Sequence, residues 1–335
     1  MKENLLYGIP NDGFGIQTRT VDKPDVTVVI PLYNKGKYIV KSIQSVLNQT
    51  IQNFELIIVN DGSTDNSLEE ATSFQDERIQ IINQNNSGVS VARNNGISSA
   101  TADVVAFLDA DDEWMPDFLE TILHLNHEYP EAGVYGTGYA VFSSDECIRE
   151  NIWKPEIGNR IIPSYFNDSV DAGFPIFITS SYAAKKEVLM QVGGYKTVFR
   201  AGQDHDLFGR LALYSKVAYS PQVASKYNAG AENNVDVVKY VLEVPLEQYL
   251  LKNSIDENTV DDLPLYLDFW RVKTGGRNIY SGHRKEGRIQ LQKVTSPSLR
   301  AKKMLFIFAS YVPFNLSKIS PKLIREITHK MHLST

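Results

Sequence analysis

The chain has 335 residues, enough for one large α/β domain with an appendage or for two domains, and 42% of them are hydrophobic, an ordinary share for a protein with a core. Its single cysteine, Cys147, excludes an intrachain disulfide and fits a reducing compartment. No stretch reaches the roughly 18–20 apolar residues of a membrane-spanning helix, and residues 1–15 lack the apolar core of a signal peptide. We expect a cytoplasmic protein without a nucleic-acid partner.

Behind an irregular lead-in at residues 1–25, short apolar runs alternate with helical patterns. Buried strands are predicted at residues 26–31, 54–59, 78–82 and 104–108, and helices at residues 37–47, 67–74 and 89–100. Ser63, Thr64 and Asp65 are candidates to cap the helix at 67–74. This alternation favours an α/β fold with βαβ units and a Rossmann-like, mostly parallel sheet flanked by helices.

The second half of the sequence is less regular. A loose strand pattern covers residues 174–184, and helices are predicted at residues 185–191, 206–214, 235–251 and 263–273, with Gly193 and Gly194 breaking the first of them. We therefore expect three regions: the lead-in at 1–25, an α/β domain at 26–230, and a mainly helical extension at 231–335.

The net charge of −6 conceals an asymmetry between the extension and the rest of the chain. Residues 271–335 contain 14 lysines and arginines but only two acidic residues, Glu286 and Glu326. A basic block behind an acidic body suggests a segment that meets an anionic surface. The alternative is a solvated helical face that offsets the charge of the body.

Three of the predicted strands are each followed by a group of notable residues. Residues 31–34 (PLYN) follow the first strand, residues 60–63 (NDGS) the second, and residues 109–111 (DAD) the fourth. In open parallel sheets, ligands bind at the carboxyl ends of the strands. We expect these three strand ends to converge on one crevice.

The DAD triplet presents two carboxylates, Asp109 and Asp111, at a strand end. Hard divalent cations need oxygen ligands, and Mg²⁺ typically takes one or two carboxylates together with substrate phosphates. Such a site neutralises a diphosphate leaving group. The alternative is a solvated loop in which Asp112 caps a helix that starts near Pro116.

Further residues are suited to binding a nucleotide. A carboxylate at Asp61 can accept from a uracil N–H or from ribose hydroxyls, although Asp-Gly turns commonly bond their own backbone. Pro31 and Tyr33 can form an apolar wall for a flat base, and Asn34 can make a polar contact. Gly88 would let the backbone approach the nucleotide, and Arg93 would bring a positive charge. Taken alone, Arg93 is better explained as a surface or helix-packing residue.

The second acidic cluster is residues 203–206 (QDHD). A carboxylate beside a sugar can take the proton of an acceptor hydroxyl as a general base, and Asp204 is the first candidate, followed by Asp206. The alternative is a helix cap, a common role for Asp before a helix.

With these motifs assembled, the sequence resembles the family 2 glycosyltransferases, which have the glycosyltransferase-A fold. The resemblance covers roughly residues 25–215 and rests on motifs in matching order and spacing: VTVVIPLYN, FELIIVNDGSTD, NNSGVSVARNNG, VVAFLDADDEWMP, the GGY at 193–195 and the QDHDL at 203–207. It implies an inverting, metal-dependent transfer of sugar from a nucleotide-diphosphate sugar, with UDP as the expected nucleotide and Mn²⁺ or Mg²⁺ as cofactor.

The resemblance also implies roles for single residues. The nucleotide-sugar pocket would be formed by Pro31, Tyr33, Asn34, Asp61, Gly88, Arg93 and Asp109. Asp111, with Asp109, would bind the metal, Asp204 would be the base, and Trp114 would lie near the sugar or acceptor. Two departures matter: Gln203, on the acceptor side, stands where the family commonly has Glu, and the Gln-x-x-Arg-Trp motif of processive synthases is absent. The absence favours transfer of single sugars.

Two other functions compete with a transferase that acts on a glycan or a lipid-linked acceptor. A non-catalytic nucleotide-sugar-binding module is disfavoured because four acidic residues are retained together: Asp61, Asp109, Asp111 and Asp204. A sugar-phosphate nucleotidyltransferase would be expected to have a Gly-rich phosphate loop after the first strand, where this chain has PLYNKGKY.

Residues 296–330 combine aromatic and aliphatic residues with flanking lysines and arginines, which is typical of an interfacial membrane segment. The apolar part is too short to span a bilayer, and Pro313 would kink it. We expect peripheral attachment to the cytoplasmic face of an anionic membrane. The alternative is that these residues pack onto the protein or form an oligomer contact.

Overall fold

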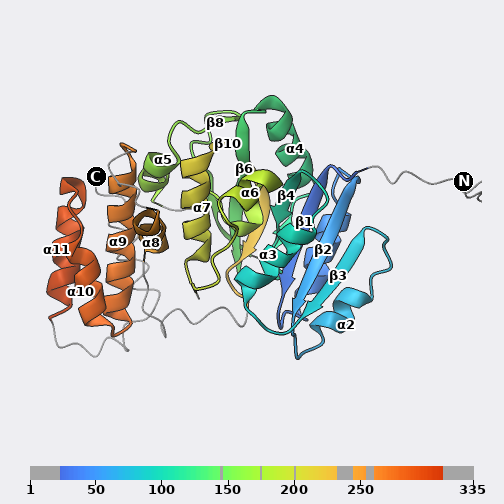
Figure 1. The fold of residues 1–335 in the computed structure, drawn as a ribbon, viewed down its shortest axis with the longest axis horizontal. Helices are drawn as coiled ribbons and strands as arrows, with labels where there is room; N and C mark the ends of the chain where they lie inside the picture. Colours follow the sequence, from blue (N-terminus) through green and yellow to red (C-terminus); the bar gives the residue numbers. More distant parts are fainter. Residues whose placement is uncertain are drawn as a thin grey trace, which may run out of the picture.

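A computed structural model of the chain describes residues 23–143, 146–173, 176–199, 201–231, 244–253 and 260–311. Nearly all of the expected lead-in lies outside these residues. Within them, a ten-stranded sheet forms the centre and the last helices form a separate layer at one side (Figure 1). The strand order is β3-β2-β1-β4-β9-β6-β10-β5, with β7 paired to β6 and β8 to β10.

The strands are β1 (Val26–Leu32), β2 (Phe54–Asp61), β3 (Ile79–Gln84), β4 (Val104–Phe107), β5 (Glu113–Trp114), β6 (Ala132–Ser143), β7 (Glu146–Asn151), β8 (Arg160–Ile161), β9 (Tyr182–Lys185) and β10 (Lys216–Asn228). The helices are α1 (Ile39–Leu47), α2 (Ser67–Thr72), α3 (Val89–Ser99), α4 (Phe118–Glu128), α5 (Tyr165–Ala172), α6 (Lys186–Gln191), α7 (Gln203–Tyr214), α8 (Pro245–Lys252), α9 (Leu263–Tyr280), α10 (Arg284–Gln292) and α11 (Arg300–Ala309).

The four strands predicted in the first half form the parallel part of the sheet. β2 pairs with β3 and β1, and β1 pairs with β4, all in parallel. The β6–β10 pair is also parallel, whereas β9, β7, β8 and β5 join the sheet in antiparallel pairs. The α/β class and the flanking helices are confirmed, and the parallel pairing is concentrated where the βαβ pattern is clearest.

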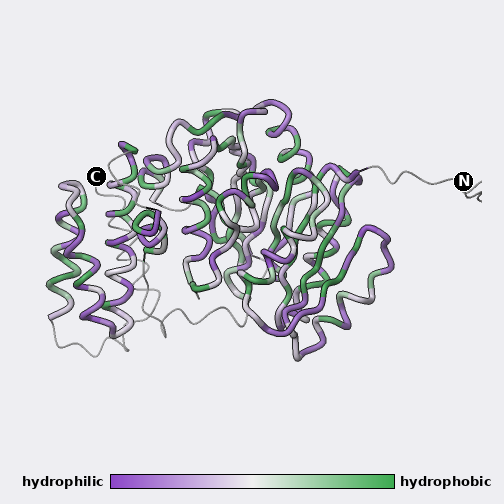
Figure 2. The backbone as a smooth tube through the Cα atoms, in the orientation of Figure 1, coloured by the Kyte–Doolittle hydropathy of each residue, from purple (hydrophilic) through white to green (hydrophobic). Residues whose placement is uncertain are grey.

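Both faces of the sheet are buried, which explains why its strands read as continuous apolar runs. Val28 and Ile30 of β1 pack on one face with α1 and α4, while Val29 packs on the other with α3 and α7. Figure 2 shows hydrophobic residues along these central strands and alternating hydrophobic and hydrophilic turns in the helices beyond them.

Two predicted elements differ from the structure. The strand expected over 174–184 begins only at Tyr182, because residues 179–181 form a 3₁₀ turn, and residues 174 and 175 lie outside the described part. The helix expected to end at Lys273 continues to Tyr280. Gly275 and Gly276 lie within this helix without breaking it. A side chain at these positions would collide with Leu291 of α10 and Phe306 of α11. The two glycines therefore serve close packing of three helices, which stabilises α9 through this point.

The helical C-terminal extension is confirmed for its described residues. A separate apolar core joins α9, α10 and α11. Of the helix expected at 235–251, only the part in α8 lies within the described residues. Among the helices of the described part, none is both long and apolar enough to cross a membrane.

Candidate functional site

The ends of β1, β2 and β4 come together at one edge of the sheet because these strands run in parallel. Asn34, after β1, has a positive φ of 51° and its side chain accepts a hydrogen bond from the Thr64 N–H at 2.8 Å. Its own N–H donates to the Ser63 hydroxyl at 3.2 Å. The loops after β1 and β2 therefore contact each other directly, as expected for the first two strand ends.

Asp65 and Ser67 fix the loop that follows Asn34. The Lys35 N–H donates to the Ser67 hydroxyl at 2.7 Å, and the Gly36 N–H donates to Asp65 at 3.1 Å. The other Asp65 oxygen accepts from the Ser67 N–H at 3.0 Å, so Asp65 holds the first residue of α2. The N-cap residue of α2 is Asn66, which makes no side-chain cap hydrogen bond, so none of the three candidates occupies the cap position. One carboxylate thus orders both the start of α2 and the loop after β1.

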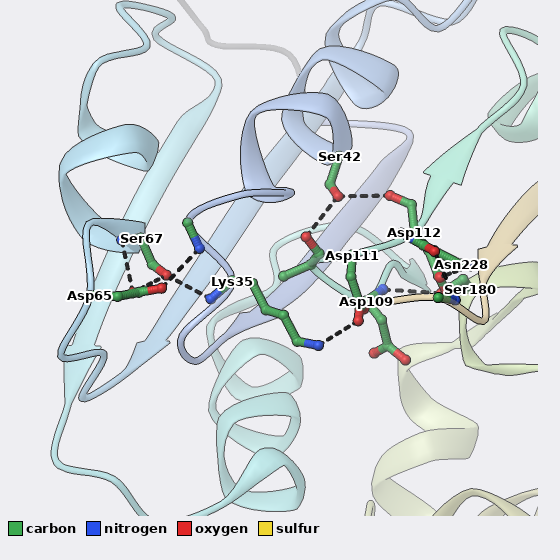
Figure 3. Close-up of polar contacts among 12 residues, drawn as sticks. Lys35, Ser42, Asp65, Ser67, Asp109, Asp111, Asp112, Ser180 and Asn228 are labelled. Carbon is green, nitrogen blue, oxygen red and sulfur yellow. Dashed lines mark hydrogen bonds and ion pairs between the residues drawn. The ribbon is translucent and has the colours of Figure 1, made fainter. Parts of the chain in front are cut away.

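The loop after β4 is built by buried hydroxyls (Figure 3). The Ser42 hydroxyl of α1 lies 2.9 Å from the Ala110 carbonyl oxygen and 2.7 Å from that of Asp112. The Asp109 N–H donates to the Ser180 hydroxyl at 3.1 Å. Ser180 reaches this loop from the 3₁₀ turn before β9, which explains why residues 179–181 leave the strand.

Asp112 is buried in this loop and does not cap a helix, so that alternative is wrong. Its carboxylate accepts from the Ser180 hydroxyl at 2.5 Å and from the Asn228 N–H at 2.8 Å. Burial, together with the charges of Asp111 and Asp109, raises the pKa of Asp112 well above its ordinary value. The helix that follows, α4, begins only at Phe118.

The two carboxylates of the DAD triplet each contact a basic side chain. The Arg93 guanidinium lies 2.6 Å from Asp109. The Lys35 Nζ lies 2.6 Å from Asp111 (Figure 3). Burial and the charge of Asp109 raise the pKa of Asp111. The two carboxylates are therefore close enough to repel each other, and positive charge between them is favourable.

This pair fits a divalent cation whose shell is completed by other molecules. Within the described ranges, no group of three or more His, Cys, Asp or Glu side chains is arranged to hold a metal. Mg²⁺ nevertheless typically keeps several waters and uses one or two carboxylates plus substrate phosphates. Asp109 and Asp111 supply that number and type of ligand.

Asp61 anchors the loop before α3. Its buried carboxylate accepts from the Ser87 N–H at 2.7 Å, from the Gln84 amide at 2.7 Å and from the Gly88 N–H at 2.9 Å. The alternative, a turn whose Asp bonds its own backbone, is therefore wrong for Asp61. Gly88 has a φ of 92°, and a Cβ added to it would meet open space. Asp61 thus positions an accessible backbone segment.

The apolar wall expected from Pro31 and Tyr33 is only half present. Pro31 is buried within β1, whereas the Tyr33 side chain, one residue beyond the strand, is 45% exposed. Of the two, only Tyr33 offers a surface to a flat ring.

Arg93 connects the DAD triplet to α7. It is buried, its guanidinium lies over the Tyr195 ring at 4.9 Å, and its Nη1 lies 3.9 Å from Asp204. Burial opposes its charge, but Asp109 and Asp204 raise the pKa of Arg93 above its ordinary value. The simpler expectation of a surface residue is wrong, because two carboxylates compensate the buried guanidinium.

Asp204 lies in the first turn of α7, two residues after the N-cap Gly202, whose φ is 80°. Its enclosed Oδ1, like the Oε1 of Gln203, has no hydrogen-bond donor among the described residues. Burial, reinforced by the charge of Asp109 and opposed by Arg93, raises the pKa of Asp204. A carboxylate with a raised pKa is a stronger base than one in water.

Asp206 has a different environment. Both it and Arg210 are fully buried, and their side chains bond at 2.9 Å. Arg210 also donates to the carbonyl oxygens of Val192 and Gly194, at 2.6 and 2.9 Å. Asp206 therefore anchors α7 to the GGY turn and is inaccessible to an acceptor.

Two further residues depart from what the sequence suggests. Trp114 is buried, stacks on Phe118 at 4.1 Å and donates to the Ser180 carbonyl at 2.7 Å, so its ring lies in the core and not on an acceptor surface. Asn94, to which we assigned no role, exchanges two hydrogen bonds of 2.8 Å with the backbone of Tyr195. It joins α3 to the GGY turn.

Comparisons with known proteins agree with this arrangement. Residues 27–193 match the glycosyl transferase family 2. Glycosyltransferase GlyG of Streptococcus pneumoniae serotype 4 is 40% identical over 123 residues, which are 36% of this chain and 41% of GlyG. This chain thus spans about two fifths of the length of that relative.

Two solved structures have a similar fold. S. aureus TarS 1-349 in complex with UDP-GlcNAc matches with a TM-score of 0.57 and 16% identity, over 86% of this chain and 89% of that one. The mannosyltransferase PcManGT from Pyrobaculum calidifontis, in complex with GDP-Man and Mn²⁺, matches with a TM-score of 0.56 and 18% identity, over 93% and 88%. At these identities the likeness concerns the fold alone.

Proposed function

Since this chain belongs to the family 2 glycosyltransferases, we propose that it transfers a single sugar from a nucleotide-diphosphate sugar, with UDP as the nucleotide, to an acceptor hydroxyl with inversion. The observation that carries the proposal is the position of Arg93. Its guanidinium lies 2.6 Å from Asp109 and 3.9 Å from Asp204, so one buried residue joins the candidate donor site to the candidate base.

On the donor side, Tyr33 offers its exposed ring to the base of the nucleotide. Asp61 holds the Gly88 segment, whose open surface lets a donor approach the backbone. Asp109 and Asp111 would hold Mn²⁺ or Mg²⁺, which when bound neutralises charge on the diphosphate. That two structures of similar fold contain UDP-GlcNAc and GDP-Man supports a nucleotide-sugar donor.

On the acceptor side, Asp204 takes the proton of the acceptor hydroxyl. The hydroxyl oxygen then forms a bond to the anomeric carbon, and the bond from that carbon to the diphosphate breaks, with the electron pair leaving on the diphosphate. A single displacement of this kind inverts the anomeric configuration. The raised pKa of Asp204 favours the proton transfer, and Arg93 keeps its carboxylate charged.

We also propose a lipid-linked or glycan acceptor met at the cytoplasmic membrane face. Support comes from α11 and the turn that follows it, where four apolar side chains are exposed: Met304, Leu305, Phe308 and Tyr311. The basic residues Arg300, Lys302 and Lys303 precede them, as an interfacial segment requires. Residues 312–330 of the predicted segment lie outside the described part.

A donor screen with Mn²⁺ tests the proposed function. Purified protein is incubated with each UDP- and GDP-sugar, and consumption of the sugar nucleotide is followed. We expect one donor to be consumed by the native protein and not by the Asp111→Ala variant. With an α-linked donor, the NMR coupling constant of the product should report a β linkage. A product with retained configuration would contradict the role of Asp204.

A further inference from the structure

The ion pair between Lys35 and Asp111 is enclosed. Their side chains are 14% and 13% exposed, and the Nζ lies 2.6 Å from the carboxylate oxygen (Figure 3). The backbone on both sides of Lys35 is fixed, because Ser67 and Asp65 accept from the N–H groups of Lys35 and Gly36. The ammonium is therefore presented to one of the two candidate metal ligands from a defined loop.

The two basic residues at the DAD triplet differ in how firmly they are held. Arg93 is buried on α3, packs on the Tyr195 ring and faces both Asp109 and Asp204. The ammonium of Lys35 is carried on a flexible four-carbon stem, which can turn without moving its backbone. Lys35 is thus the partner that can leave its carboxylate, and Arg93 is the partner that stays.

We propose that Lys35 is a donor-phosphate-binding residue that occupies Asp111 until a divalent cation and a nucleotide diphosphate enter together. This inference rests on the proposed function, because it takes Asp111 as a ligand of the cation. On entry, the Lys35–Asp111 pair is exchanged for two new pairs, one between Asp111 and the cation and one between Lys35 and a phosphate oxygen. Lysine is a common phosphate-binding residue, acting as a point charge.

Because of this exchange, the affinity of the site for the cation depends on bound nucleotide, and its affinity for the nucleotide depends on bound cation. A cation that binds without nucleotide has to displace the Lys35 ammonium from Asp111, and no phosphate oxygen is then present to pair with that ammonium. A nucleotide without cation can recruit Lys35 only by leaving the enclosed Asp111 carboxylate without the ammonium that lies 2.6 Å from it. Each ligand therefore increases the affinity of the site for the other, by the same factor.

Binding of Mn²⁺ to the full-length chain tests the inference without any sugar transfer. The free Mn²⁺ signal in electron paramagnetic resonance gives the Mn²⁺ affinity with no nucleotide, with UDP and with GDP. For the native protein we expect the better nucleotide to increase Mn²⁺ affinity about tenfold or more. In Lys35→Met, Mn²⁺ alone should bind about tenfold more tightly than to the native protein, and nucleotide should add little.

Three further variants complete the experiment. Lys41→Met removes an exposed lysine of α1 and should leave the coupling at its native value. Lys35→Arg keeps a positive charge at the site and should restore most of the coupling. Lys35→Gln, which keeps a polar side chain, replaces Lys35→Met if thermal melting shows that the latter does not fold.

The outcomes separate this inference from the function on which it rests. If native protein binds Mn²⁺ with nucleotide, but Lys35→Met and Lys35→Gln keep native Mn²⁺ affinity and native coupling, the role of Lys35 is wrong and the metal site stands. If native protein binds no Mn²⁺ with either nucleotide, the proposed metal site fails and the inference fails with it.

Discussion

The strand-end site and the C-terminal helices use charged residues in opposite ways. At the ends of β1, β2 and β4, acidic and basic side chains are buried or half-buried and contact each other across loops far apart in sequence, as in the Lys35–Asp111 and Arg93–Asp109 pairs. Residues 263–311 carry ten basic and two acidic residues, and exposed apolar side chains lie among them.

The few acidic partners of the C-terminal helices serve packing. Asp268 contacts Arg271 and accepts from the N–H groups of Thr295 and Ser296, and Glu247 of α8 bonds both Arg271 and Lys293. With ten basic residues against two acidic ones, residues 263–311 nevertheless keep a net positive charge. The strand-end site thus brings charges of both signs together in its interior, whereas the C-terminal helices carry mostly positive charge.

The largest expected effect comes from removing charge at the strand ends. Asp111→Ala should reduce turnover about a thousandfold or more, since a bound cation contributes several kcal/mol to leaving-group stabilisation. EDTA should reduce the turnover of the native protein by the same factor. Sugar-nucleotide consumption measures both. Asp103→Ala, an exposed acid at the other end of β4, is the matched control and should keep native turnover. Full activity in EDTA would remove the metal from the mechanism.

A second variant tests whether neighbouring carboxylates on α7 have different roles. Asp206→Asn should lower the free energy of unfolding by about 3–5 kcal/mol, because it breaks a fully buried ion pair with Arg210. Urea denaturation measures the loss. Asp204→Asn should change stability far less, because the Asp204 side chain is partly exposed and 3.9 Å from Arg93. Equal losses in the two variants would contradict the separation.

The smallest expected effect concerns the C-terminal surface. The double variant Met304→Asp, Phe308→Asp should reduce flotation with anionic liposomes, because both side chains are exposed and each acid opposes an anionic surface. Leu251→Asp, at an exposed apolar residue of α8, is the control. Raising the salt concentration should also weaken flotation, since each basic residue near such a surface contributes about 1 kcal/mol. If native protein does not float, the segment has a packing role.

The parallel half of the fold was predictable because its strands are buried on both faces. Their apolar runs leave a clear pattern, and the polar residues at their ends identify the site. β6 and β10 were not predicted. β6 contains three glycines, and Gly136 lies where any side chain would collide with Phe177. β10 contains Pro221, at an irregularity in its pairing with β6. Close packing in one strand and a bulge in the other hide the strand pattern.

The same limit applies to the site. The Ser180 hydroxyl bonds Asp112 and Asp109 in the loop after β4, which lie 68 and 71 residues away in sequence. No local sequence pattern predicts such a contact. Asn94 bonds Tyr195 across 101 residues. Lys35 did carry a signal, since it lies three residues beyond the end of β1, in the loop where we propose that the donor phosphate binds. Trp114 is the opposite case. It lies next to a motif, yet its side chain is buried in the core, which is a common position for an aromatic residue.

The most direct test of the account is the Asp204→Asn variant, because it separates the base from the donor site. With the cognate donor and Mn²⁺, transfer should fall about 10²–10⁴-fold while the Kd of the donor stays within about twofold. In native protein, activity should fall as the pH drops through the raised pKa of Asp204, because only the ionised carboxylate accepts the proton. Transfer at the native rate by Asp204→Asn would show that another group is the base and would contradict the role assigned to Asp204.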